Sequence, residues 1–128
     1  MKTKNLINKK VLVVSVLTSI LVLSGCGRKS PKQYGQQIAG RATTQIGGIL
    51  KEPASFDGKT VTIEGVIAAE CMTGCWFDVA GEGGKIHVDV KPSGFAIPQK
   101  VGKKVIVEGQ VSLRDGQLTL IGKGVEIK

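Results

Sequence analysis

The sequence predicts a small all-β domain, a five-stranded barrel, preceded by a signal peptide and a flexible tether with one short helix. Two observations on the chain lead to this fold class. Apolar and polar residues alternate with a period of two over five segments between residues 60 and 127, and turn sequences separate these segments. Such alternation gives each strand one apolar face, which is typical of antiparallel strands around a single core.

The first 25 residues have the features of a secretory signal peptide. Four lysines precede an uncharged apolar run over residues 11–23. A bilayer core about 30 Å thick requires about 20 apolar residues, so this run is too short to cross it as a helix. Its length suits the apolar region of a signal peptide, about 7–15 residues. We therefore assign residues 1–25 to a signal peptide.

The residues Leu23-Ser24-Gly25-Cys26 resemble the lipobox of bacterial lipoproteins. The resemblance implies diacylglyceryl transfer to the Cys26 thiol, cleavage before Cys26, and acylation of the new amino group. The alternative is an ordinary signal peptide followed by an unrelated cysteine. Acyl chains hold a protein to a membrane because each buried methylene contributes about 0.8 kcal/mol. The expected location is the cell envelope, and Gly27, which is not a retention-signal aspartate, favours the outer membrane of a Gram-negative cell.

The basic charge of the chain is concentrated before the predicted domain. The formal net charge is +8, but 4 of the 18 basic residues lie in the signal peptide. From Glu52 onward there are 9 basic and 10 acidic residues. A nucleic-acid-binding domain carries a basic stripe on its folded face, so this balance argues against nucleic acid as a partner. The basic tether is interpreted as a spacer; the alternative is attraction to an anionic membrane, worth about 1 kcal/mol per charge.

Residues 26–45 are predicted to be a tether, and the barrel domain to cover residues 46–128. Glycine, serine, lysine and glutamine dominate the tether and lack a stable periodicity. Ile46, Ile49 and Leu50 have helical spacing, which predicts one short helix before the first strand.

Five segments then show strand alternation, and their inward residues are expected to form one core. These residues are Val61, Ile63, Phe77, Val79, Ile86, Val88, Val105, Val107, Leu118 and Leu120. Residues 81–84 and the Asp115-Gly116 pair connect neighbouring strands, and Asp-Gly is a strong hairpin signal. The apolar face changes near Gly65 and again near Gly122. Such changes predict bulges or sharp coiling, which allow a small sheet to close.

Five strands, a coiled first strand and no long helix indicate an OB-fold-like barrel. Four motifs accompany this pattern: GKxVxIEGV from Gly58, CxxGCW from Cys71, GFxIP from Gly94 and GKxVxVEG from Gly102. Over residues 46–128 they resemble a family of small secreted bacterial domains of unknown function with OB-like barrels. The resemblance implies a fold and a location outside the cytoplasm, and no activity.

Cys71 and Cys75 fall in the predicted loop between the first two strands. If Cys26 carries lipid, two thiols remain, and pairing is the default outside the inner membrane. The first hypothesis is therefore a disulfide between Cys71 and Cys75, without a cofactor. A loop this short constrains the unfolded chain only modestly, so the bridge would mainly shape the loop.

A copper or zinc site is the second hypothesis for this region. It would use Cys71, Met72, Cys75 and His87, because thiolate, thioether and imidazole suit Cu(I) or Zn(II). Strand alternation places His87 outward and Cys75 inward, so a shared site requires a bulge near Cys75. A thiol–disulfide enzyme is disfavoured, because such enzymes use C-x-x-C at a helix N-terminus and the spacing here is C-x-x-x-C.

The outward residues of the second and third strands form a candidate ligand face. With a short turn between the strands, Asp78 lies opposite His87, and Trp76 lies opposite Asp89. This face binds oligonucleotides or oligosaccharides in OB folds. A tryptophan beside carboxylates and a histidine could stack on a sugar ring or hold a peptide. The alternative is a tryptophan covered by the tether or by a neighbouring loop.

The composition gives catalysis little support, because one histidine, no nucleophile–base–acid set and no phosphate-binding glycine loop are present. The predicted function is a membrane-anchored envelope lipoprotein that presents a non-catalytic binding or scaffolding domain. Its partner is expected to be an envelope protein, a glycan or a small ligand. The alternatives are a Cu(I)- or Zn(II)-binding lipoprotein and a structural partner subunit of an envelope assembly.

Overall fold

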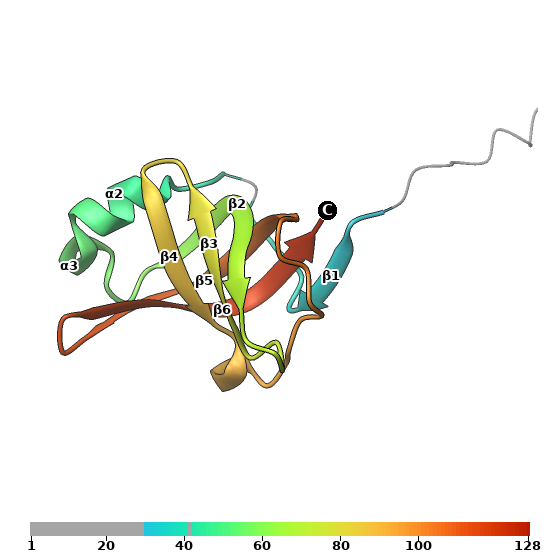
Figure 1. Ribbon diagram of the computed structural model, residues 1–128. Coiled ribbons are helices and arrows are strands. Elements are labelled where there is room, and N and C mark those ends of the chain that lie inside the picture. Colours follow the sequence, from blue (N-terminus) through green and yellow to red (C-terminus); the bar gives the residue numbers. More distant parts are fainter. Residues whose placement is uncertain (1–29, 41) are drawn as a thin grey trace, which may run out of the picture.

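The computed structural model describes residues 30–40 and 42–128, and Figure 1 shows how the elements are arranged. The predicted signal peptide, residues 1–25, and the lipidation site Cys26 lie outside the described residues. In the described part of the chain, no helix is long and apolar enough to cross a membrane. The elements in chain order are β1 (Lys32–Gly35), α2 (Ile46–Lys51), α3 (Pro53–Phe56), β2 (Thr60–Glu70), β3 (Trp76–Gly81), β4 (Gly84–Asp89), the 3-10 helix η1 (Lys91–Ser93), β5 (Lys104–Arg114) and β6 (Gln117–Ile127).

Strands β2 to β6 form a closed barrel, so the predicted OB-fold-like class is confirmed. β2 pairs with β3 and β3 with β4, while β5 pairs with both β2 and β6, all antiparallel. A short parallel pairing between β4 and β6 joins the two remaining edges. In chain order, β5 comes between β4 and β6 and runs opposite to both. β6 therefore runs in the same direction as β4.

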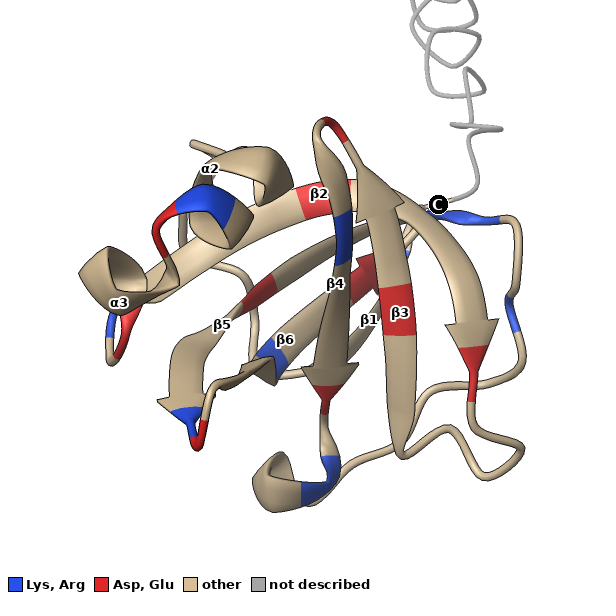
Figure 2. Ribbon diagram, turned by 60° about the vertical axis from the view of Figure 1, so that its left-hand side comes forward, with Lys and Arg blue, Asp and Glu red and all other residues tan. Residues whose placement is uncertain are grey.

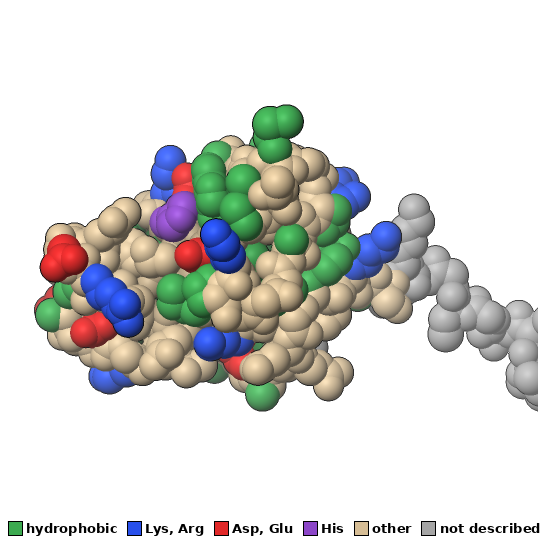
Figure 3. Space-filling model, turned by 90° about the horizontal axis from the view of Figure 1, so that it is seen from below, with side chains coloured by type: hydrophobic (Ala, Val, Ile, Leu, Met, Phe, Trp, Pro, Cys, Tyr) green, Lys and Arg blue, Asp and Glu red, His purple; other side chains and the backbone are tan. Residues whose placement is uncertain are grey.

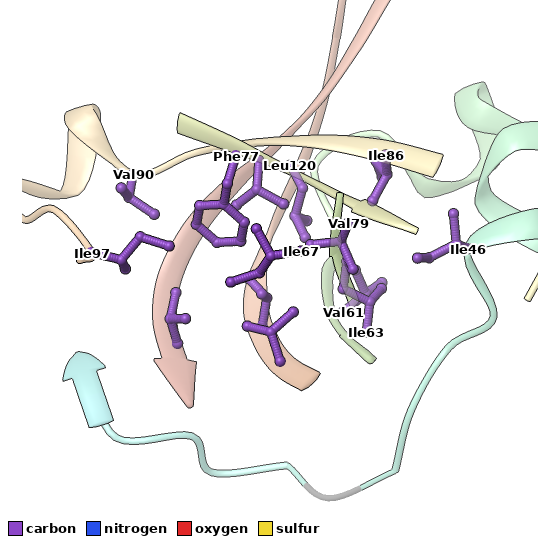
Figure 4. Close-up of a cluster of buried hydrophobic side chains, with 14 of the residues drawn as sticks. Ile46, Val61, Ile63, Ile67, Phe77, Val79, Ile86, Val90, Ile97 and Leu120 are labelled. Atoms are coloured by element: carbon purple, nitrogen blue, oxygen red, sulfur yellow. The ribbon is translucent and has the colours of Figure 1, made fainter. Parts of the chain in front are cut away.

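The apolar core fills the barrel. Nine of the ten predicted core residues are buried, and Leu118 packs against the core from its margin. Figure 4 shows Phe77, Leu120 and Ile67 pointing toward one another from three different strands. Burial of apolar surface contributes about 25 cal/mol per Å², which makes these strand faces the main source of stability.

The bulge predicted near Gly122 is present on β6. Glu108 of β5 pairs with Gly124, whereas the next residue, Gly109, pairs with Gly122. Lys123 is therefore the extra residue of the bulge. An extra residue bends its strand and increases the local twist, which helps a sheet of few strands to close.

β2 keeps its facing through Gly65, contrary to the prediction. Ile67 is fully buried like Ile63, whereas Val66 is 38% exposed. The irregularity in the pairing with β3 comes only after Ile67. Gly65 has a different role: a Cβ at this position would overlap the carbonyl oxygen of Ala80. Glycine therefore permits the close approach of β2 and β3.

Part of the predicted tether, residues 26–45, belongs to the fold. β1 pairs antiparallel with the last residues of β6. Ile38 is buried, Tyr34 packs against the core, and the Thr44 N–H donates to the carbonyl of Thr62 at 2.7 Å. The sequence pattern missed β1 because main-chain hydrogen bonds hold this strand, and these require no apolar alternation.

The predicted short helix corresponds to α2, and a second single-turn helix, α3, follows it. Ile46 and Ile49 bury the inner side of α2 in the core. The N–H of Gly47 donates to the carbonyl of Glu82 at 2.9 Å, so α2 rests on the turn between β3 and β4. Pro53 begins α3, a position where its fixed φ and missing N–H are tolerated.

Candidate functional site

The candidate ligand face lies on the outer side of the β3–β4 hairpin. The pairing places Trp76 opposite Asp89 and Asp78 opposite His87, the register that the sequence predicts. All four side chains are partly exposed, whereas Phe77 on the opposite face of β3 is fully buried. Figure 3 shows the single histidine of the chain on the surface beside hydrophobic side chains. The structure therefore brings the four predicted residues together on one exposed face.

His87 connects the aromatic and acidic parts of this face. Its Nδ1 atom lies 2.8 Å from Oδ1 of Asp78. Its ring centroid lies 5.2 Å from that of Trp76, and the two ring planes are tilted by 41°. The Nζ atom of Lys85 lies 3.9 Å from Oδ2 of Asp78. Asp78 thus holds the imidazole against the indole, which restricts the motion of both rings.

A hollow of about 380 Å³ adjoins this face. Its lining includes Asp78, Lys85 and His87 from the hairpin, and Gln117 and Leu118 from the start of β6. The volume is at the small end of the range for ligand sites, about 300–1,000 Å³. In OB folds, the loop between the last two strands flanks the ligand. The hollow therefore lies where an OB-fold ligand would meet both elements.

The two cysteines lie close together in the loop between β2 and β3. Their Sγ atoms are 3.1 Å apart, and both residues are free thiols. A disulfide has a sulfur–sulfur length of about 2.05 Å, so the structure does not show the predicted bond between Cys71 and Cys75. The Oγ1 atom of Thr73 lies 3.1 Å from Sγ of Cys71 and 3.4 Å from Sγ of Cys75. The disulfide stays a prediction, and a small movement would bring the sulfurs together.

Hydrogen bonding makes Cys71 more acidic than an ordinary thiol. The Thr73 hydroxyl and, next, the Cys75 thiol lower the pKa of Cys71 from 9.0 to about 7. Hydrogen bonds to the charged form of a group favour that form. Because the thiolate is the nucleophile and the metal ligand, the lowered pKa makes Cys71 more reactive near neutral pH than an ordinary thiol.

Gly74 sets the shape of the cysteine loop. Its φ of +71° lies in the left-handed region, and a Cβ would overlap the carbonyl oxygen of Ile97. The Ile97 N–H donates to the Gly74 carbonyl at 3.1 Å, and Nε2 of Gln99 donates to the Cys71 carbonyl at 2.6 Å. The connection between β4 and β5 therefore holds the cysteine loop from one side.

Glu70 is a residue of this region that sequence reasoning missed. Its Oε1 atom accepts a hydrogen bond from the Lys100 N–H. Its Oε2 atom is buried and has no hydrogen-bond partner among the described residues. Its position before Cys71 was visible in the sequence, but no local pattern predicts a contact 30 residues away. Glu70 ties the end of β2 to the same connection that holds the cysteine loop.

The four residues of the predicted metal site do not converge. Met72 is 93% exposed, and His87 pairs with Asp78 instead of the cysteines. Across residues 30–40 and 42–128, no group of three or more His, Cys, Asp and Glu side chains could hold a metal ion. Of the four predicted copper or zinc ligands, only the thiols of Cys71 and Cys75 lie close together.

The comparisons with known proteins concern the fold. No protein-family model and no curated protein matches the sequence. Among solved structures, the chain is similar to YgiW, a hypothetical protein from E. coli, with a TM-score of 0.51 and 17% sequence identity. The similarity covers 74% of this chain and 100% of that chain. At this identity the likeness shows the fold alone. Of the family resemblance expected from the sequence, it supports only the small OB-fold-like β-barrel.

Proposed function

We propose that the protein is a membrane-anchored envelope lipoprotein whose barrel binds a glycan through the outer face of the β3–β4 hairpin. The observation that carries the binding proposal is the contact set of His87, which Asp78 holds against Trp76. Rings that are ordered before a ligand arrives lose less entropy when it binds. The partly exposed indole and imidazole therefore offer a ready stacking surface.

The chemistry of the face suits sugars. Aromatic rings pack on the apolar side of a sugar ring, and carboxylates accept hydrogen bonds from its hydroxyl groups. Asp78 and Asp89 supply such acceptors on both sides of the ring pair. Oδ1 of Asp78 faces His87, and Oδ1 of Asp89 accepts a hydrogen bond from the Lys91 N–H at 3.0 Å. Both carboxylates are thus held in place by the protein before a ligand arrives.

The anchoring part of the proposal rests on the lipobox. Leu23-Ser24-Gly25-Cys26 follows an apolar run of signal-peptide length. β1 begins at Lys32, a few residues after Cys26. An acylated Cys26 would therefore keep the barrel close to the membrane that holds its lipid.

Ligand binding can be followed through Trp76, which is the single tryptophan of the chain. The protein is titrated with N-acetylglucosamine oligomers and with digested cell-wall glycan. We expect the Trp76 emission to change with saturation, and Asp78→Asn to weaken binding at least tenfold, about 1.4 kcal/mol. The control Glu82→Gln removes a carboxylate at the turn of the same hairpin and should bind normally. A titration without saturable change, or equal binding by both variants, contradicts glycan binding at this face.

Anchoring is tested separately with Cys26→Ser. We expect this variant to lack acyl chains by intact mass and to leave the detergent-soluble membrane fraction. Met72→Ala serves as the processing control, because it changes an exposed side chain far along the chain. Membrane partitioning of Cys26→Ser equal to that of the unchanged protein contradicts the lipoprotein proposal and leaves the glycan proposal to its own test.

A second candidate function is binding of a soft metal ion by the two thiols. Two neighbouring thiols in one loop, Cys71 and Cys75, and the low pKa of Cys71 favour it, although the sulfurs would have to separate beyond their present 3.1 Å to hold an ion between them. Cu(I) accepts a site with thiolate ligands alone. Reduced protein titrated with Cu(I) should bind one ion per chain and lose both reactive thiols, and Cys71→Ser should abolish this binding. Stoichiometric binding by Cys71→Ser would exclude the two-thiol site.

A further inference from the structure

A basic hollow lies at the end of the barrel where the described chain begins. Its volume is about 740 Å³, and no aspartate or glutamate is among its lining residues. The side chains that characterise it are Lys32, Lys100, Lys103 and Lys128, together with Tyr34 and Ile127. Figure 2 shows basic segments of the β4–β5 connection next to the C-terminus. Three separate parts of the chain, β1, this connection and the end of β6, thus contribute lysines to one surface.

An exposed apolar side chain projects beside these lysines. Val101 is 59% exposed, although large apolar residues on the barrel strands are mostly buried. It lies in a turn closed by a 3.0 Å hydrogen bond from the Lys103 N–H to the Lys100 carbonyl. The N–H of Gly102 donates to the Ile67 carbonyl at 2.8 Å, which fixes the turn on the barrel. An apolar tip between basic side chains is the pattern of segments that lie at a membrane interface.

The covalent chain keeps this surface near the bilayer. The described residues begin at Ser30, four positions after Cys26. Four residues span at most about 14 Å when fully extended. Attraction between lysines and anionic headgroups acts over a Debye length of about 8–10 Å at physiological ionic strength. A lipidated Cys26, which is part of the proposed function, therefore holds the lysines at a distance where they feel the membrane charge.

We propose that this basic surface docks the barrel on anionic phospholipid headgroups. Lys32, Lys100 and Lys103 contact the phosphates, and Val101 enters the interface between them. Docking gives the anchored domain one fixed orientation instead of free rotation on its acyl chains. The inference rests on the lipid anchor, but it concerns a different surface from the candidate ligand face.

The experiment uses the mature lipidated protein in vesicles, with a reporter at the docking turn. The reporter combines Trp76→Phe with Val101→Trp, so that residue 101 carries the single tryptophan. One set of vesicles contains phosphatidylcholine alone, and the other also contains phosphatidylglycerol. In both sets, brominated lipids quench a tryptophan that reaches the interface. We expect a blue shift and strong quenching only with phosphatidylglycerol, and reversal of both at high salt.

Charge variants of the reporter protein identify the surface. The triple variant Lys32→Gln, Lys100→Gln and Lys103→Gln should lose the quenching. Each lysine raises the equilibrium constant for docking about fivefold, so three raise it on the order of a hundredfold. The matched control is Lys51→Gln, Lys59→Gln and Arg114→Gln. These residues belong to α2, the turn before β2 and the β5–β6 hairpin, which lie on the side away from the C-terminus in Figure 1. The control should dock normally.

The outcomes distinguish a failure of the docking surface from a failure of the lipid anchor. Intact mass of the reconstituted protein reports acylation of Cys26 directly, so a protein without acyl chains contradicts the anchor alone. An acylated reporter that responds equally to both vesicle types overturns the docking surface. Equal loss of quenching in the two triple variants overturns it as well, because the net charge of the protein, and not this surface, would then be responsible for docking. Circular dichroism of each variant verifies that the barrel is folded.

Discussion

The sulfur atoms of Cys71 and Cys75 lie 3.1 Å apart, and the hydroxyl of Thr73 is within hydrogen-bond distance of both. The loop that carries them is held by Gly74, which packs against the carbonyl of Ile97. The pair is therefore brought together by the fold before any bond forms. Oxidation of such a pair requires little chain movement, whereas a distant pair would have to deform the barrel.

Protein isolated from the envelope without reductant is expected to have Cys71 and Cys75 joined in a disulfide. Thiol labelling should then be close to zero, and two thiols should appear after reduction. Cys75→Ser should lower the free energy of unfolding by about 2 kcal/mol or less, because the closed loop is short. It should also shift the emission of the neighbouring Trp76. Two fully reactive thiols in freshly isolated protein would show that the pair stays reduced.

The reduced protein should show a reactive thiolate at Cys71. Its alkylation rate is expected to rise through pH 7, near the lowered pKa, and Thr73→Val should move this rise toward pH 9.0. Thr73→Ser keeps the hydroxyl and serves as the control. The unfolded chain retains its proton up to a higher pH than the folded chain, so the free energy of unfolding should increase between about pH 7 and 9. An unchanged rate profile in Thr73→Val would contradict the role of the hydroxyl.

Val88→Asp should unfold the barrel, because Val88 is fully buried and an unpaired buried charge costs several kcal/mol. Val66→Asp is the matched control: it makes the same change at a strand residue that is 38% exposed. Thermal unfolding followed by circular dichroism measures both. Similar melting temperatures for the two variants would mean that the inward and outward faces have been assigned incorrectly.

Gly65→Ala and Gly48→Ala should have opposite effects on stability. A methyl group at Gly65 would overlap the carbonyl oxygen of Ala80, so we expect a loss of about 1–3 kcal/mol. A methyl group at Gly48 meets no atom within 4 Å and lies in α2, where alanine is favoured over glycine by up to about 1 kcal/mol. Urea unfolding of the two variants gives both values. A neutral Gly65→Ala would contradict the close approach of β2 and β3.

The sequence by itself determined the five barrel strands and most of their facing; the exception is the predicted change of face at Gly65 of β2, where Ile67 and not Val66 is buried. Alternation is a local property of each strand, and the face that carries most of the apolar residues turns to the core wherever the strand lies. The buried Phe77 and Val88 and the exposed His87 follow from this rule alone. The opposition of Asp78 and His87 follows as well, because a short turn leaves only one register for two strands that each have an inner face.

The tertiary structure decided the features that depend on contacts between distant segments. β1 lacks the apolar alternation by which the other strands were predicted. Main-chain hydrogen bonds to β6 hold this strand, and these do not depend on side-chain type. Lys32, Lys100 and Lys103 are unremarkable where they stand in the sequence, and only closure of the barrel collects them around one hollow. The contact of Glu70 with Lys100 has the same origin. Local periodicity specifies which way a side chain points, whereas the neighbours that it meets are specified only when the whole sheet has closed.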